Sequence, residues 1–251
     1  MDLELTDRVF VVTGGARGLG RATADALVEE GARVVLSGRD EETLAAARQV
    51  LGDAAETVVA DNADPTTPDR LIRAALDRWG RLDGALVSVG GPPRGAVVTT
   101  TDEQWTAAFE SVFLGAVRVG REIGKALPHG GSLAFVLSSS VRAPLADMAI
   151  SNGLRPGLAM VAKTLADELG PAGVRVNGLL PGRVGTERVA ELDAASGDAE
   201  AARATAVLTI PLRRYGEPEE FGRVAAFVLS PAASFVSGAM LPVDGGMLRA
   251  L

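Results

Sequence analysis

A glycine cluster near the start of the chain constrains its fold more than any other feature. Residues 9–12 are apolar β-formers, Thr13–Gly20 reads Thr-Gly-Gly-Ala-Arg-Gly-Leu-Gly, and a helical apolar pattern follows. Gly14 permits a tight turn after the strand, Gly18 lets the backbone approach a pyrophosphate, and Gly20 lets the helix pack closely on the sheet. The N-terminus of that helix carries free N–H groups and a partial positive charge. This order predicts a strand, a phosphate-binding turn and a helix.

Strand-like and helical patterns alternate along the rest of the chain. Short apolar runs occur at 33–37, 57–60, 84–89, 132–137, 174–180 and 240–243, and helical patterns at 22–30, 40–51, 66–79, 101–126, 155–169 and 217–229. Thr101 and Gln104 form a capping box at the start of the segment 101–126. Repeated β-α-β units predict an α/β fold with a Rossmann-type, doubly wound parallel sheet of about seven strands. The hydrophobic content is 47%, and the composition does not change abruptly along the chain, which predicts a single domain over residues 1–251.

The charge balance and the missing cysteines exclude several classes of function. A net charge of −7 repels nucleic acid and anionic membranes, so neither is expected as a partner. With no cysteine and one histidine, we expect no disulfide, no thiolate chemistry and no metal site. The acidic start Met1–Leu5 does not resemble a signal peptide, and no apolar run has the length of a membrane span. We therefore expect a cytoplasmic protein.

The exit of the second strand indicates which dinucleotide would bind. In such folds an acid at this place accepts from the ribose 2′-hydroxyl of NAD, whereas a basic residue accommodates the 2′-phosphate of NADP. Here the exit reads Ser37-Gly38-Arg39-Asp40, and the glycine turn adds Arg17. Two guanidinium groups suit a phosphate dianion, which predicts NADP(H). The alternative is that Arg39 is a solvated loop residue and Asp40 only caps the next helix.

Motifs shared with a known family are spread over the whole chain. They are Thr13-Gly14-x-x-x-Gly18-x-Gly20, Asp61 after the third strand, Val174-Arg175-Val176-Asn177 leading to Pro181-Gly182 and Thr186, Gly216-Glu217-Pro218-Glu219-Glu220, and Val243-Asp244-Gly245-Gly246. By these motifs the chain resembles the short-chain dehydrogenase/reductase family, and within it the β-ketoacyl-carrier-protein reductase type. The resemblance implies an NADP-dependent oxidoreductase acting on a carbonyl or alcohol group of a small molecule. It also implies a homotetramer or homodimer built partly through the two long helices.

The resemblance also implies which residues hold the cofactor. They are Gly14, Arg17, Gly18, Leu19, Gly20, Arg39, Asp61, Asn62, Gly90, Arg155, Pro181, Gly182 and Thr186. The segment 186–209 matches the family's mobile lid over the substrate. Arg94, Arg142 and Arg183 could line the pocket and favour an anionic or polyphenolic compound, or could be solvated surface residues.

The catalytic pattern of the family is degenerate in this chain. The family uses a Ser that bonds the carbonyl, a Tyr that donates the proton, and a Lys that lowers the pKa of the Tyr and holds the nicotinamide ribose. By the resemblance these positions fall on Ser138, Ser151 and Arg155, and the family's Asn falls on Val112. The family's Asn-Asn-Ala-Gly stretch, which supports the central strand, reads Val87–Gly90 here. Ser138, Ser151 and Arg155 are thus the predicted catalytic set.

The single tyrosine and the single histidine do not replace the missing phenol. Tyr215 lies in a turn where the family commonly carries an aromatic residue, so it is predicted to pack, and His129 lies in the turn Pro128–Gly131 and is predicted to be solvated. Pro156, together with Gly153 and Gly157, predicts that residues 151–156 are not regular helix continuous with 157–169.

Three functions remain open from the sequence. The first is an NADPH-dependent ketoreductase in which Ser138 and Ser151 hold the carbonyl, Arg155 keeps a cation near the ribose, and the proton comes from water or from a hydroxyl group of the substrate. The second is a nucleotide-binding scaffold or sensor without turnover. The third is a non-redox cyclase or dehydratase that reuses the pocket, although an intact cofactor site would then be redundant.

Overall fold

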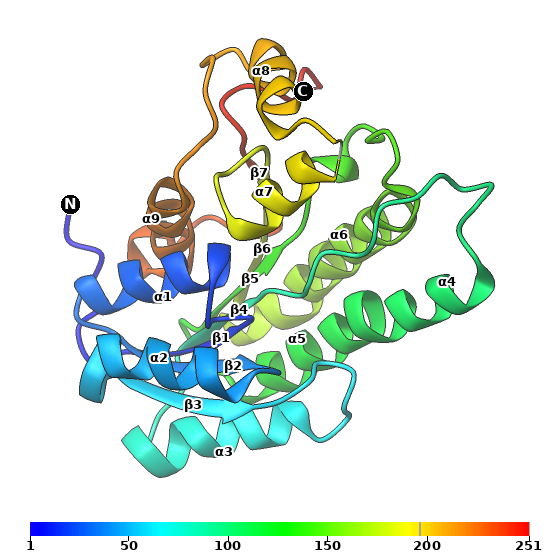
Figure 1. The fold of residues 1–251 in the computed structure, drawn as a ribbon. Coiled ribbons are helices and arrows are strands. Elements are labelled where there is room, and N and C mark those ends of the chain that lie inside the picture. Colours follow the sequence, from blue (N-terminus) through cyan, green and yellow to red (C-terminus); the bar gives the residue numbers. More distant parts are fainter. Residues whose placement is uncertain (196, 251) are drawn as a thin grey trace.

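A seven-stranded parallel sheet forms the centre of the protein (Figure 1). The computed structural model describes residues 1–195 and 197–250. The strands are β1 (Val9–Thr13), β2 (Arg33–Gly38), β3 (Ala55–Val59), β4 (Gly84–Val87), β5 (Ser132–Val136), β6 (Arg175–Pro181) and β7 (Met240–Val243). Their order in the sheet is β3-β2-β1-β4-β5-β6-β7. The chain reverses its direction of growth between β1 and β4, which is where such sheets bind ligands. The predicted Rossmann-type fold is confirmed.

Helices cover both faces of the sheet (Figure 1). One face packs against α1 (Gly18–Glu29), α2 (Glu41–Leu51) and α9 (Pro218–Leu229), and the other against α3 (Thr67–Trp79), α5 (Gly115–Ala126) and α6 (Ala149–Leu169). The remaining helices are α4 (Asp102–Ala108), α7 (Glu187–Ala194) and α8 (Ala199–Thr209). None of the helices within the described residues is both long and apolar enough to cross a membrane.

Burial on both faces explains why the central strands read as continuous apolar runs. Every residue of β1, β4 and β5 is buried. One hydrophobic core lies on each face of the sheet. Phe10 and Leu36 belong to one core, and Val35 and Phe135 belong to the other. Each fully buried side chain of this size contributes roughly 1.5–3 kcal/mol relative to exposure. The sheet is thereby a rigid base for the loops at its carboxyl edge.

The segment 101–126 is helical, as predicted, but it is not one regular α-helix. Thr101 and Gln104 form the reciprocal capping box at its start. Between α4 and α5 lies a π-helix, Phe109–Leu114, which widens the turn around Val112. Such π segments frequently occur at functional sites. Val112, where the family carries an Asn, is buried in this turn.

The prediction that residues 151–156 depart from regular helix is wrong. The helix α6 runs without interruption from Ala149 to Leu169, with Pro156 inside it. The start of α6 is held from outside, because the Asn152 side chain accepts from Leu145 N at 2.9 Å and donates to Leu145 O at 2.8 Å. These tertiary bonds compensate for the single N–H that the proline lacks.

The two glycines of this region act in packing instead of breaking the helix. A Cβ at Gly153 would lie 2.8 Å from the Trp105 ring, and one at Gly157 would lie 3.2 Å from Phe113. The missing side chains let aromatic rings from α4 and the π-helix approach α6 closely. Contacts between helices therefore outweigh the low helix propensity of glycine here.

Candidate active site

The turn after β1 has the conformation that its glycines predict. Gly14 and Gly18 have φ angles of +59° and +58°, a region that L side chains rarely adopt. A Cβ at Gly20 would lie 2.2 Å from the carbonyl oxygen of Gly14, so a larger residue would shift the backbone. Leu19 packs against the apolar core. The turn therefore lies close against the end of β1, directly before α1.

The N-terminus of α1 has no cap from a side chain. Arg17 occupies the N-cap position without a capping hydrogen bond, and the first turn holds no acidic residue. Asp40, Thr101, Thr186 and Asp198 cap α2, α4, α7 and α8 with their side chains, whereas α3 and α6, like α1, have no side-chain cap. What sets α1 apart from α3 and α6 is that it begins in the glycine turn. The first N–H groups of a helix have no partner within the helix, and they favour an anion. The start of α1 thus fits a phosphate group.

Both arginines predicted to bind a 2′-phosphate are exposed. Arg39 directly follows β2 and forms no hydrogen bond or ion pair with the part of the chain that the structure describes. Arg17 Nη1 lies 3.5 Å from Glu187 Oε2 on α7, in an exposed ion pair. Asp40 Oδ1 accepts from Thr43 N at 2.8 Å, and these bonds to Thr43 lower the pKa of the Asp40 carboxyl. Because Asp40 caps α2, Arg39 is, among the described residues, the charged side chain left without a partner at the exit of β2, and a guanidinium suits a phosphate better than a ribose hydroxyl.

The polar residues after β3 are tied to the ends of the central strands. Asp61 Oδ1 accepts from Ala63 N at 2.9 Å, and Asn62 Nδ2 donates to Ser88 O over 3.4 Å. The Thr13 hydroxyl donates to Ser88 O at 2.6 Å and accepts from Ser88 N at 2.8 Å. Thr13 and Ser88 therefore brace β1 against β4, in place of the Asn pair that supports the central strand in the family.

Residues beyond β6 lie beside the glycine turn. Pro181 ends β6, and a Cβ at Gly182 would lie 2.6 Å from the Cβ of Asp244. Thr186 caps α7, and its methyl carbon lies 3.7 Å from the Cβ position of Gly18. The glycine turn and the start of α7 thus adjoin each other, so one extended ligand can contact both.

Ser138 has a hydroxyl donor available for a ligand. It lies just beyond β5 and is partly buried. Its Oγ accepts from Ser140 N at 3.0 Å. A serine hydroxyl has one donor hydrogen, and this contact uses only an acceptor position. Ser138 can therefore donate to the carbonyl oxygen of a ligand.

Ser151 is paired with Ser140, the last residue of the serine run after β5. Ser151 lies in the first turn of α6 and is 3% exposed. Its Oγ lies 3.0 Å from Ser140 Oγ, and either hydroxyl can be the donor. Ser140 Oγ also donates to Ser151 O over 3.3 Å. The sequence showed only the run Ser138–Ser140 and gave no sign that its last member meets a residue on α6.

Arg155 joins the ends of two neighbouring strands. Arg155 is 5% exposed. Its Nη1 donates to Val136 O at 2.6 Å and its Nη2 to Gly90 O at 3.4 Å, while its buried Nε has no partner in the described residues. Burial lowers the pKa of Arg155 to about 10, so the group stays charged at neutral pH. The charge lies where the ends of β4 and β5 meet the loop 88–95.

The described residues of segment 186–209, predicted as a lid, form α7 and α8, which lie in the upper half of Figure 1. Two arginines bridge α7 and the loop after β4. Arg188 on α7 donates to Pro92 O at 2.9 Å, and Arg94 of the loop donates to Leu192 O at 3.3 Å. Nothing in the sequence pattern distinguished Arg188 from a surface residue.

Tyr215 packs as predicted and anchors the same segment. It is 2% exposed, and its hydroxyl donates to Asp193 Oδ2 at 3.0 Å. Asp193 also accepts from Arg183 at 2.7 Å, and Arg203 lies over the Tyr215 ring at 4.5 Å. Burial raises the pKa of Tyr215, and the bond to Asp193 adds to that effect. This phenol lies in a structural network and is not a substitute for the missing acid.

Two other residues considered from the sequence are exposed. His129 is exposed in the turn before β5, as predicted. Arg142 is exposed and donates to Met240 O over 3.4 Å.

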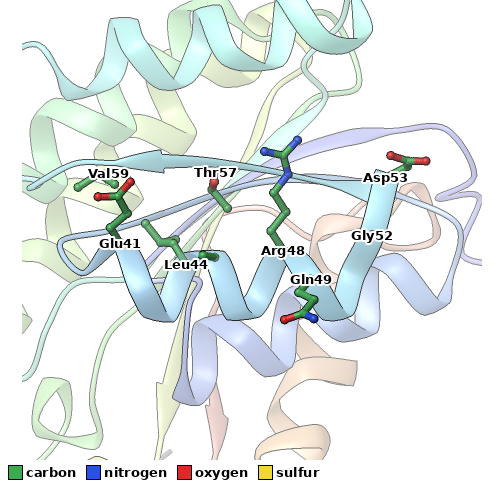
Figure 2. Close-up of a pocket in the computed structure, with 9 residues that line it drawn as sticks. Glu41, Leu44, Arg48, Gln49, Gly52, Asp53, Thr57 and Val59 are labelled. Atoms are coloured by element: carbon green, nitrogen blue, oxygen red, sulfur yellow. The ribbon is translucent and has the colours of Figure 1, made fainter.

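A surface hollow between α2 and the edge strand β3 is separate from these residues. Its lining includes Glu41, Leu44, Arg48, Gln49 and Val59 (Figure 2). None of the lining residues was predicted to bind the cofactor or to act in catalysis. The candidate active site is instead the carboxyl edge of the sheet around β1, β4 and β5.

The chain matches known reductases over almost its whole length. A family model described as enoyl-(acyl carrier protein) reductase matches residues 14–248. An uncharacterized oxidoreductase of Mycobacterium tuberculosis is 35% identical over 247 residues, covering 96% of this chain and 91% of the relative. The levodione reductase of Leifsonia aquatica is 32% identical over 260 residues, covering 98% and 96%. A 3-oxoacyl-[acyl-carrier-protein] reductase of Synechocystis is 31% identical over 252 residues, covering 97% and 98%.

A solved structure has nearly the same fold. The L-sorbose reductase of Gluconobacter frateurii, complexed with NADPH and L-sorbose, has a TM-score of 0.94 and 28% identity, and the match covers 100% of both chains. The agreement of family model, relatives and fold establishes that the chain belongs to the short-chain dehydrogenase/reductase family and is an oxidoreductase of that family.

Proposed function

We propose that the protein is an NADPH-dependent reductase of a small-molecule carbonyl compound. The observation that carries the proposal is the pairing of an uncapped α1 N-terminus with a free Ser138 donor on the same carboxyl edge of the sheet. The first feature suits a phosphate, and the second suits a carbonyl oxygen. Membership of an oxidoreductase family supports the same conclusion.

The cofactor would lie across the switch point of the sheet. The turn Gly14–Gly20 would hold the pyrophosphate, and Arg17 and Arg39 the 2′-phosphate. Leu19, Asp61 and Asn62 would line the adenosine end, and Gly90, Arg155, Pro181, Gly182 and Thr186 the nicotinamide end. At Gly90 the Cβ position has nothing within 4 Å, so the ring has room to approach the backbone there. When bound, NADPH supplies the hydride to the carbonyl carbon.

Ser138 would orient and polarise the carbonyl. Its hydroxyl donates to the carbonyl oxygen and continues to do so as negative charge develops there. Ser151 would assist when Ser140 turns its single hydrogen from Ser151 O to Ser151 Oγ, because that arrangement leaves the Ser151 hydrogen for a ligand. Arg155 contributes a fixed positive charge at the ends of β4 and β5, near Ser138.

The proton would come from the substrate or from water. A serine hydroxyl is a poor acid at neutral pH, and Arg155 remains charged there, so neither replaces the phenol. A hydroxyl group next to the reacting carbonyl could protonate the developing alkoxide internally. Substrates with such a neighbouring hydroxyl are therefore expected to react faster than simple ketones.

A carbonyl panel tests the proposed function. Purified protein is mixed with NADPH and with hydroxyketones, phenolic ketones and simple ketones, and the loss of NADPH absorbance is followed. Ser138→Ala should lower the rate roughly 10²–10³-fold through the lost oxyanion donor, and Ser151→Ala should have a smaller effect. Tight NADPH binding with no consumption in any mixture would favour a scaffold or sensor. Conversion of a substrate without change of the cofactor would favour a cyclase or dehydratase.

We also propose that the protein assembles as a homotetramer or homodimer through α4–α6. Phe109, in the π-helix between α4 and α5, is 43% exposed, and Met160 on α6 is 65% exposed. Phe109 stacks on Phe113 with ring centroids 5.3 Å apart. Exposed apolar side chains grouped on neighbouring helices are typical of subunit contacts. Sedimentation velocity at several concentrations gives the assembly mass directly.

A further inference from the structure

The two arginines that are buried in the described residues are satisfied to different degrees. Arg175 donates to four backbone carbonyls, those of Val228, Leu229, Ser230 and Val236. Arg155 donates to two carbonyls, one of them at 3.4 Å, and its Nε has no partner in residues 1–195 and 197–250. Arg175 therefore completes a structural contact, whereas Arg155 retains unused hydrogen-bonding capacity.

The charge of Arg155 is also uncompensated. No carboxylate of the described residues forms an ion pair with it. The arginines around the mouth of the site do have such partners: Arg183 lies 2.7 Å from Asp193, Arg188 3.3 Å from Glu191, and Arg94 3.8 Å from Asp147. A buried ion without a counter-charge is strongly unfavourable. Arg175 has no ion-pair partner in the described residues either, but four backbone carbonyls accept from its guanidinium, whereas only two accept from Arg155. Of these two buried charges, that of Arg155 is therefore the less compensated.

Arg155 lies at a different part of the carboxyl edge from the turn proposed to hold the pyrophosphate. Val136 ends β5 and Gly90 follows β4, so Arg155 lies under the part of the edge beyond the switch point. The uncapped helix that suits the phosphates follows β1, on the other side. Ser138, the carbonyl donor, lies two residues beyond Val136. Arg155 therefore shares its part of the edge with Ser138, the proposed carbonyl donor.

We propose that the substrate itself carries the counter-charge of Arg155, and that it is a carbonyl compound with a carboxylate next to the reacting carbonyl. The inference rests on the proposed function in one respect: it assumes that the carbonyl group of the substrate binds at Ser138. The carboxylate need not touch the guanidinium, because charges interact strongly through a poorly hydrated interior. Neutral analogues of the same shape bind without this attraction and should be weaker ligands.

Equilibrium binding of an acid and its ester tests this inference. The protein is saturated with NADP⁺, which cannot reduce a ketone, and is titrated calorimetrically with benzoylformate or with methyl benzoylformate. We expect the acid to bind at least about tenfold more tightly than the ester. Arg155→Gln should abolish this difference, and Arg155→Lys should retain most of it. Arg33→Gln removes an ion-paired arginine at the start of β2, at the opposite edge of the sheet, and should leave the preference unchanged.

Two results would overturn the inference. One is equal affinity for acid and ester, or no binding of the acid, in the wild-type protein. The other is an undiminished preference for the acid in Arg155→Gln. If Arg155→Gln does not fold, the affinities of the wild-type protein and of Arg155→Lys for the acid and the ester still test the inference. If the protein prefers the acid but consumes no NADPH with any carbonyl compound, the proposed reductase activity is refuted and the inference about Arg155 stands. If the protein reduces neutral ketones but binds acid and ester equally, the reductase activity stands and the inference about Arg155 is refuted.

Discussion

The packing of Trp105 on Gly153 makes a quantitative prediction about α6. In an ordinary helix interior, Gly→Ala raises the free energy of unfolding by roughly 0.5–1 kcal/mol because alanine has the higher helix propensity. At Gly153 the new Cβ would lie 2.8 and 2.9 Å from two atoms of the Trp105 ring, which real Cβ atoms essentially never do. Overpacking of this kind costs about 1–3 kcal/mol. Gly153→Ala should therefore lower the free energy of unfolding by roughly 0.5–2 kcal/mol.

Gly170 provides the matched control. It lies at the other end of the same helix with φ −54°, and nothing lies within 4 Å of its Cβ position. Gly170→Ala should raise the free energy of unfolding by about 0.4–1 kcal/mol. Urea unfolding of both variants and the wild type gives the comparison. If Gly153→Ala stabilises the protein as much as Gly170→Ala does, contact with Trp105 does not explain why this glycine is tolerated.

Three further predictions concern the cofactor, the degenerate catalytic set and acid stability. NADPH should bind at least about tenfold more tightly than NADH in calorimetry, and replacing Arg17 and Arg39 together by Gln should remove that preference; equal affinities in the wild type would contradict the assignment. Ser151→Tyr with Arg155→Lys restores the family pattern and should slow reduction of the native substrate, because the phenol fills the space assigned to the ligand; faster reduction would argue against substrate assistance. The bond from Arg214 lowers the pKa of Glu220 to about 2, so the stabilisation present above pH 4.5 should be lost on acidification towards pH 2, and Glu220→Gln should flatten the unfolding profile in that range.

The sequence was informative wherever local pattern and burial agree. The runs that became β1, β4 and β5 are apolar at every position because both faces of the sheet are covered. The glycine turn could be predicted in detail because each position requires glycine for a steric reason. At Gly20, for example, the backbone of Gly14 occupies the space that a Cβ would need.

The failures have tertiary causes. The helix around Pro156 forms because Asn152 is held by the backbone of Leu145, a contact that helix propensity does not contain. Ser140 meets Ser151 only because the turn after β5 folds back onto α6. The incomplete set of partners around Arg155 depends on where two strand ends lie in space.

Transfer of isotope from cofactor to product tests the central claim most directly. NADPH carrying deuterium at the transferable C4 position is incubated with the protein and with a hydroxyketone from the panel, and the alcohol product is analysed by mass spectrometry. A carbonyl reductase incorporates one deuterium at the former carbonyl carbon, and Ser138→Ala should lower the yield in proportion to its rate. An alcohol without deuterium, or no alcohol while NADPH remains tightly bound, would contradict the reductase.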